Sequence, residues 1–198
     1  MRSVHLILLF MAVALAAPAQ KGRLRAGAAR VEITPPEDAA LPMYGYRGRT
    51  EGHTGVHDPL FFRAIVLDDG ERQAALVAGD IGSTPHEVWE AVVPRISRAT
   101  GIEPAYILLS ATHTHGAPHP APTNGENPQH DAYLAGVHDK IVSVVQEAQA
   151  KLQPARMGAG TGEARVNMNR LARTADGVWW LGHNPDGVSD KTVRVVRL

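Results

Sequence analysis

Apolar runs predict three strands in the first part of the chain. Residues 24–34 alternate loosely between apolar and polar positions, whereas residues 60–67 and 72–78 are almost continuously apolar. Short apolar runs bounded by turn residues are typical of strands. The intervening Asp68-Asp69-Gly70 contains an Asp-Gly pair, which favours a tight hairpin turn. The last two runs are therefore predicted to pair antiparallel.

Two later stretches show the period of amphipathic helices. Residues 131–152 place their apolar side chains on one stripe of a helix. The segment Thr84-Pro-His-Glu87 has the form of a capping box, which predicts another helix over residues 84–100 with Gly101 as its C-cap. Pro94 lies inside this helix and is expected to kink it.

The order of these elements predicts the fold class. A strand at 105–113 follows one helix and a strand at 157–166 follows the other, so strands and helices alternate over residues 74–166. Such connections usually form right-handed crossovers between parallel strands. We therefore expect an α/β fold with a mixed, mostly parallel central sheet, helices packed on it, an antiparallel hairpin and a last strand at 192–198.

The long connection over residues 37–57 is a candidate functional loop. Connections of this length inside one domain are usually functional or disordered, and its Tyr and Arg residues argue against disorder. His53 and His57 lie in its polar, Gly-rich end, where exposure to solvent is favoured over a role as ligands.

Composition narrows the classes of function. The chain has 198 residues, of which 20 are Lys or Arg, 20 are Asp or Glu and none is Cys. Balanced charge argues against nucleic acid as a partner, because such binding needs a basic surface. Without cysteine, a metal would need His, carboxylate or tyrosinate ligands. The length suits one domain, placed at residues 24–198.

The first residues have the pattern of an export signal. Arg2 precedes an apolar run over residues 6–17, and Ala17-Pro18-Ala19 supplies the small residues of a cleavage site. The run is too short to span a membrane comfortably. We expect residues 1–19 to be a signal peptide and the mature protein to be exported, periplasmic or secreted, without a stable membrane span.

Two histidines stand where the strand at 105–113 ends. His113 and His115 are separated by Thr114 and followed by Gly116 and Pro118, which interrupt regular structure. Side chains two apart in an extended segment point the same way, and ligands of open α/β sheets bind beyond the strand ends. Imidazole is a common zinc ligand, but a catalytic zinc needs about three protein ligands. The pair therefore predicts part of a metal site.

Four stretches carry a recognisable family pattern, and together they extend over nearly all of residues 24–198. The most specific is Leu109-Ser-Ala-Thr-His-Thr-His-Gly-Ala-Pro118; the others are Ala26-Gly-Ala-Ala-Arg-Val-Glu-Ile-Thr34 with Met43-Tyr-Gly-Tyr46, residues 60–67 with Gly79-Asp-Ile-Gly82, and Asn167-Met-Asn-Arg170 with Asn184-Pro185 and residues 193–198. In this order they resemble the N-terminal domain of the neutral/alkaline (non-lysosomal) ceramidases.

The resemblance implies a function and a set of site residues. The family hydrolyses the amide bond of ceramide to sphingosine and a fatty acid with one zinc ion, so the expected substrate is lipid-like or a small amide. His113 is implied as a zinc ligand, and His115 as a residue that faces the site and helps to hold the amide carbonyl. Arg170 is implied as a substrate or oxyanion contact, and Gly45 as part of the substrate pocket. Asp80 lies in a family motif, and we assign it either a structural role or a supporting role beside the site residues.

Departures from the family pattern leave the substrate open. Gly116-Ala117-Pro118 follows the histidine pair where the family usually has Ser-Gly-Pro, and Leu171 follows Arg170 where the family usually has Ser. The other zinc ligands of the family, a His, a Glu and a Tyr, are expected beyond residue 198, so the chain is expected to be an incomplete member. Three alternatives follow: a ceramidase, a related hydrolase of another amide or ester, or an inactive truncated domain.

Overall fold

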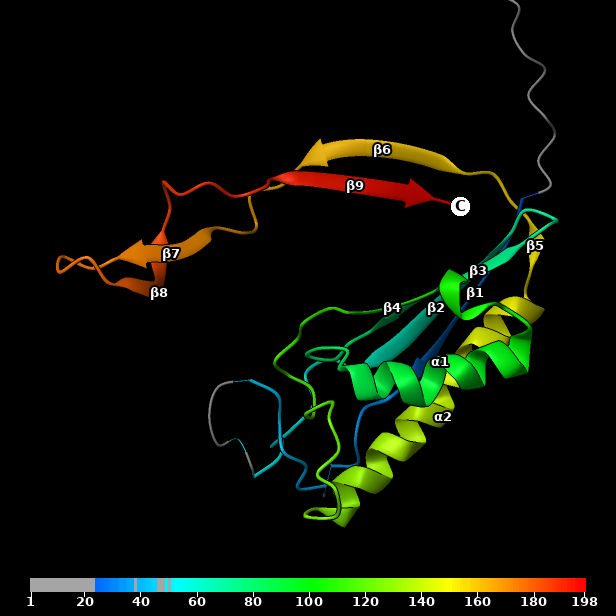
Figure 1. Ribbon diagram of the computed structural model, residues 1–198, viewed down its shortest axis with the longest axis horizontal. Helices are drawn as coiled ribbons and strands as arrows, with labels where there is room; N and C mark the ends of the chain where they lie inside the picture. Colours follow the sequence, from blue (N-terminus) through cyan, green and yellow to red (C-terminus); the bar gives the residue numbers. More distant parts are fainter. Residues whose placement is uncertain (1–23, 38, 46–48, 50) are drawn as a thin grey trace, which may run out of the picture.

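A five-stranded sheet with two helices packed on one face forms the main body of the protein (Figure 1). The computed structural model describes residues 24–37, 39–45, 49 and 51–198. The sheet has the order β4-β3-β2-β1-β5. Its strands are β1 (Arg25–Glu32), β2 (Phe61–Asp68), β3 (Gln73–Gly79), β4 (Ile107–Ala111) and β5 (Gln153–Pro154). The strands predicted at 24–34, 60–67, 72–78 and 105–113 are thus confirmed.

The mixed α/β class is confirmed, but the expectation of a mostly parallel sheet is wrong. β2 runs antiparallel to β1 and β3, and β5 runs antiparallel to β1. Among the described strands of this sheet only β3 and β4 pair in parallel. The connections explain the difference, because a tight turn joins β2 to β3 and a single helical crossover joins β3 to β4. The strand predicted at 157–166 does not enter the sheet.

Both predicted helices are present. Helix α1 (His86–Thr100) connects β3 to the short 3-10 helix η1 (Pro104–Tyr106) before β4, and α2 (Pro128–Ala150) follows the loop beyond β4. Gly101 adopts φ 76° and donates its N–H to the carbonyl of Ser97, as the C-cap prediction requires. The capping-box prediction is wrong, because Pro85 is the N-cap of α1 and no side chain caps that end. At α2, the side chain of Asn127 accepts the N–H of His130 at 3.0 Å.

The core lies between the helices and one face of the sheet. Alternate residues of β2 point into it, so Phe62, Ala64 and Val66 are buried whereas Arg63 is exposed. The predicted stripe of α2 packs on the same core. Its buried members are Leu134, Val137, Ile141, Val144, Val145 and Ala148. Packing of the helices on this face fixes the positions of β3 and β4, and therefore of the loops that follow them.

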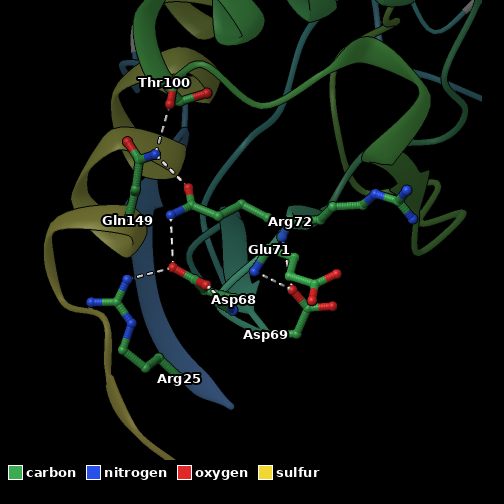
Figure 2. Close-up of polar contacts among 9 residues, drawn as sticks. Arg25, Asp68, Asp69, Glu71, Arg72, Thr100 and Gln149 are labelled. Carbon is green, nitrogen blue, oxygen red and sulfur yellow. Dashed lines mark hydrogen bonds and ion pairs between the residues drawn. The ribbon is translucent and has the colours of Figure 1, made fainter. Parts of the chain in front are cut away.

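A polar network closes the opposite end of the sheet (Figure 2). The side chain of Asp68 is buried and accepts hydrogen bonds from Arg25 Nη2 at 2.5 Å and Gln73 Nε2 at 2.9 Å. Gln149 of α2 donates to Gln73 Oε1 and to the carbonyl of Thr100. The network therefore ties β1, the β2–β3 turn and the ends of both helices together.

The last forty residues form two antiparallel strand pairs that extend away from the helix-covered sheet (Figure 1). β6 (Gly158–Glu163) pairs with β9 (Thr192–Arg197), and β7 (Asn169–Arg173) pairs with β8 (Trp179–Asn184). The strands expected at 157–166 and 192–198 are confirmed, whereas β7 and β8 were not predicted. Trp179 and Trp180 are 61% and 64% exposed.

The described part of the chain contains no helix that is both long and apolar enough to cross a membrane. The signal peptide predicted at residues 1–19 lies outside the described residues, so export stays a prediction.

Candidate active site

The histidine pair lies where β3 and β4 end side by side. The backbone of β4 continues its parallel pairing past the strand, since the N–H of Thr112 bonds the carbonyl of Gly79 at 3.0 Å and that of His113 bonds Ile81 at 3.1 Å. His113 then adopts φ 62°, in the left-handed region that non-glycine residues seldom occupy. This turn directs the chain out of the sheet and into the loop that carries His115. Backbone strain of this kind is often found at functional sites.

The imidazole of His113 is fixed in one tautomer. Its Nδ1 lies 2.5 Å from the carbonyl oxygen of Gly82. Because a carbonyl can only accept, Nδ1 carries the proton and donates it, which leaves the lone pair on Nε2. Metal-binding histidines commonly donate their other ring nitrogen to a carbonyl in this way. Of the two ring nitrogens of His113, Nε2 is therefore the one left to accept a bond.

The rings of His113 and His115 lie close together, as predicted. Their centroids are 5.2 Å apart with an angle of 74° between the ring planes. Tyr44 packs edge-on against both, at 5.7 Å from His113 and 5.2 Å from His115, and also lies 5.7 Å from His119. The aromatic wall around the pair was missed from the sequence, because residue 44 lies in a different loop from the histidines.

The loop that carries Tyr44 is tied to the histidine loop by backbone pairing. The N–H of Tyr44 bonds the carbonyl of Ala117 at 2.9 Å, and that of His119 bonds Pro42 at 2.7 Å. Gly45, at φ 119°, follows directly, and a Cβ there would lie 2.8 Å from Nδ1 of His115. Gly45 thus lies against the ring of His115, and its role in lining the substrate pocket stays a prediction.

Two glycines at and beyond the end of β3 leave space for aromatic rings that pack against them. A Cβ at Gly82 would come within 2.1 Å of the Tyr44 ring, and one at Gly79 within 2.3 Å of the Phe62 ring. Neither glycine has a positive φ, so space rather than backbone conformation requires them. Sequence reasoning placed Gly79 and Gly82 in a family motif without finding this role.

A cleft of about 540 Å³ adjoins the histidine loop. Thr114 and Gly116 form part of its wall, opposite residues of the 52–60 segment. His53 and His57 both line it. His57 is exposed and pairs with Asp58 at 2.7 Å, in agreement with the sequence interpretation. The ring nitrogens of His53 are buried and make no hydrogen bond, which the sequence did not predict.

Asp80 joins two neighbouring strands through hydrogen bonds. Its Oδ2 accepts the backbone N–H of Phe61 at 3.0 Å and the Nη1 of Arg63 at 2.7 Å. These bonds connect the end of β3 to the start of β2. Asp80 also lines the cleft.

Arg170 is not brought to the histidine pair. It lies on β7, in the strand pairs that extend away from the main sheet (Figure 1), and its Nε donates to the carbonyl of Gly182 at 3.1 Å. Its predicted role as a substrate or oxyanion contact stays a prediction.

The fit of the residues to zinc is partial. His113 has the tautomer and the exposure that a zinc ligand needs. Within the described residues no three His, Cys, Asp or Glu side chains gather into a group that could hold a metal ion. The described part of the chain therefore does not contain a complete zinc site by itself, and the role of His113 as a zinc ligand stays a prediction.

Comparison with known proteins identifies the family. A model of the family described as neutral/alkaline non-lysosomal ceramidase, N-terminal, matches residues 24–175. The chain belongs to this family. A neutral ceramidase from Pseudomonas aeruginosa is 33% identical over an alignment of 178 residues, and the match covers 83% of this chain and 26% of that protein. A neutral ceramidase from Mycobacterium tuberculosis is 29% identical over an alignment of 141 residues, and the match covers 64% of this chain and 22% of that protein.

Solved structures of ceramidases share the fold. A ceramidase complexed with C2 superposes with a TM-score of 0.64 at 29% identity, over 74% of this chain and 24% of that one. The neutral ceramidase from Pseudomonas aeruginosa gives a TM-score of 0.60 at 28% identity, over 76% of this chain and 24% of that one. The chain spans about a quarter of the length of the ceramidases that it matches.

Proposed function

We propose that this chain belongs to an exported, zinc-dependent amidohydrolase of the neutral ceramidase type, which hydrolyses the N-acyl bond of ceramide to give sphingosine and a fatty acid. Membership of the ceramidase family supports the reaction class. The observation that carries the proposal is the hydrogen bond from His113 Nδ1 to Gly82, which leaves Nε2 of an exposed imidazole as the metal-binding atom.

Each site residue of this chain has a distinct part in the proposal. His113 holds the metal through Nε2, while Gly82 fixes its tautomer. His115, 5.2 Å away, holds the amide carbonyl of the substrate, and Gly45 leaves room beside its ring for the substrate to approach. When bound, zinc lowers the pKa of a water molecule toward neutrality and polarises the carbonyl.

Arg170 completes the proposed set as an oxyanion contact. A donor of this kind is typically worth about 3–4 kcal/mol in the transition state. In the described structure the Arg170 guanidinium, on β7, donates to the carbonyl of Gly182 on β8, so this assignment is supported by the family resemblance and not by proximity to His113.

Export is part of the proposal and is supported by the sequence of residues 1–19. A basic start, an apolar run and a small-residue cleavage site form a signal peptide. N-terminal sequencing of the mature protein tests this: a start near Gln20 supports export, and an intact Met1 in the secreted or periplasmic fraction contradicts cleavage.

The substrate is tested by release of labelled fatty acid. The protein is expressed from its complete reading frame, loaded with zinc and supplied with a ceramide labelled in the acyl chain. Release that stops with a chelator and returns with added zinc supports the proposal. A simple N-acyl amide and an acyl ester serve as parallel substrates, so that hydrolysis of these alone identifies a related hydrolase. No release from any of the three substrates contradicts the enzymatic function.

A further inference from the structure

The imidazole of His53 lines the cleft beside the histidine loop without a hydrogen-bond partner of its own. Both of its ring nitrogens, Nδ1 and Nε2, are buried, and neither bonds to any of the residues that the structure describes. Nearly all buried polar atoms of native proteins are paired, and an exception calls for a functional explanation. We therefore asked which kind of molecule in the cleft would pair with this ring.

Backbone packing, and not a bond of the ring, holds His53 in place. The preceding residue, Gly52, has φ 79° and lies against the backbone of residues 39–41. A Cβ at Gly52 would lie 3.0 Å from both the carbonyl oxygen of Ala39 and the Cα of Ala40. Leu41 in the same segment is fully buried. His53 therefore follows a tightly packed glycine, and its ring nitrogens are left to bind a ligand.

The charged side chains of the cleft wall already have partners. Arg49 donates to two backbone carbonyls, Asp80 pairs with an arginine of β2, and Asp58 pairs with the histidine before it. Among the ionisable side chains that line the cleft within the described ranges, only His53 has no partner. No three His, Cys, Asp or Glu side chains of these ranges gather to hold a metal ion. These facts favour a neutral hydrogen-bonding ligand over an ion.

The chemistry of the ring points to a hydroxyl group as its partner. A neutral imidazole has one N–H donor and one acceptor, and a hydroxyl group can pair with either nitrogen because it both donates and accepts. The cleft volume of about 540 Å³ is within the range of small-molecule sites. Thr114, between His113 and His115, lines the same cleft, so a substrate whose amide lies at the histidine pair is expected to extend into it. Ceramide has a hydroxyl group on each carbon that flanks its amide-bearing carbon.

We propose that His53 is a substrate-recognition residue, which binds a hydroxyl group beside the amide and thereby selects hydroxylated N-acyl amides over simple ones. This inference rests on the proposed function for the identity of the substrate. The bond-breaking step and the metal ion involve other residues, so His53 is expected to govern selectivity between substrates.

Thermal unfolding tests whether the ring nitrogens are free of structural bonds. Replacement of an unpaired buried polar group by an apolar one is nearly neutral or stabilising. His53→Phe and the smaller His53→Leu are therefore expected to melt at or above the wild-type temperature. His57→Phe is the matched control, because His57 lines the same cleft but is exposed. If both variants of His53 melt more than about 4 °C below wild type and the control does not, the nitrogens have bonds within the protein and the inference is overturned.

The binding step is tested by nuclear magnetic resonance of the protein expressed from its complete reading frame, with ¹⁵N-labelled histidine. The ring-nitrogen signals of His53 are identified by their loss in His53→Phe. Saturation with a short-chain ceramide is expected to shift these signals and to leave those of His57 unchanged. An analogue with hydrogen in place of both hydroxyl groups should cause no such shift. Unchanged His53 signals, or equal shifts with the two ligands, overturn the inference.

Kinetics measure the selectivity directly. In the wild-type protein kcat/KM is expected to be about tenfold higher for ceramide than for the analogue without hydroxyl groups, as one hydrogen bond provides. This ratio should fall to near one in His53→Phe, stay at the wild-type value in His57→Phe, and be partly kept in His53→Gln, which has a donor and an acceptor. An unchanged ratio in His53→Phe overturns the inference. If the wild-type protein releases no fatty acid from either substrate, the proposed function fails, and the ring signals still decide whether His53 binds a hydroxyl group.

Discussion

The imidazole of His113 donates its Nδ1 proton to the carbonyl of Gly82 across a distance of 2.5 Å. The two residues lie beyond the ends of neighbouring parallel strands, β4 and β3. The left-handed backbone of His113, at φ 62°, directs the ring toward this carbonyl. The bond makes Nε2 the only ring atom able to bind a metal ion, and the account of the site depends on it.

Replacement of His113 should remove metal without unfolding the protein. In His113→Ala, zinc content per chain is expected to fall to near zero, because a zinc site with one of its few ligands missing binds weakly. His86→Ala is the matched control, since His86 is exposed on α1, where it pairs with Glu90 and stacks on Trp89. Elemental analysis of the purified proteins checks the prediction. Equal zinc content in His113→Ala and wild type would show that the ligands lie elsewhere.

Gly45→Ala should displace the ring of His115, in addition to straining the backbone at residue 45. At φ 119° an alanine is strained, and its Cβ would lie 2.8 Å from Nδ1 of His115. Gly125→Ala is a matched control, because Gly125 also has a positive φ, 92°, but a Cβ there meets no atom within 4 Å. Both variants are expected to lose about 1–3 kcal/mol of stability to backbone strain.

Activity distinguishes the two glycine variants. Fatty-acid release should fall by at least about tenfold in Gly45→Ala, because displacement of a reacting group slows catalysis steeply. Gly125→Ala should retain the wild-type rate when assayed below its melting temperature. Equal rates of fatty-acid release in the two variants would show that Gly45 has no role in the site.

Asp80→Ala should weaken the fold and leave the metal in place. Its side chain, 19% exposed, accepts bonds from the Phe61 N–H and from Arg63. Loss of this acceptor is expected to cost about 1–3 kcal/mol in the free energy of unfolding. Asp58→Ala, which removes an exposed carboxylate paired with His57, should change stability by less than about 0.5 kcal/mol. Urea unfolding and zinc analysis check both; loss of zinc in Asp80→Ala with unchanged stability would assign Asp80 to the metal site.

The buried carboxylate of Asp68 should make stability depend on acid pH. Hydrogen bonds from Gln73, then from the Gly70 N–H, and the pairing with Arg25 lower its pKa below the ordinary value of 3.8, against the opposing effect of burial. A carboxyl group with a lowered pKa in the folded state stabilises the protein above its unfolded pKa. This contribution is lost as the pH falls from about 3.8 through the lower folded pKa.

Asp68→Asn isolates this contribution from other carboxylates. At pH 7 the variant is expected to lose about 1.5–3 kcal/mol, the range for hydrogen bonds to a charged group. The difference from wild type should shrink as the pH is lowered below 3.8. Glu71→Gln, in the same turn but exposed, serves as the control. A difference between Asp68→Asn and wild type that is independent of pH would contradict the role of the ionised carboxylate.

Local patterns in the sequence were enough to predict most elements of the main sheet. The hairpin at Asp69-Gly70 forms because the Asp69 carboxylate accepts the N–H groups of Glu71 and Arg72. The same type of signal, Asp176-Gly177, precedes β8, and Gly177 has φ 87°. The β7–β8 hairpin could therefore have been predicted from its turn.

Strand direction could not be read from the same patterns. Periodicity identifies a strand but not its partner, and β5 turns back from α2 to pair with β1 instead of entering beside β4. Likewise, the spacing of His113 and His115 predicted their proximity, because two-residue spacing is local. Their contacts with Tyr44 depend on a loop about 70 residues away in sequence, so they required the structure.

The most direct test of the central claim is anomalous diffraction at the zinc absorption edge from crystals of the zinc-loaded protein, expressed from its complete reading frame. The account predicts an anomalous peak about 2.0–2.1 Å from Nε2 of His113, with Nδ1 still bonded to Gly82. A zinc peak that lies away from His113, or one bound to its Nδ1, would contradict it.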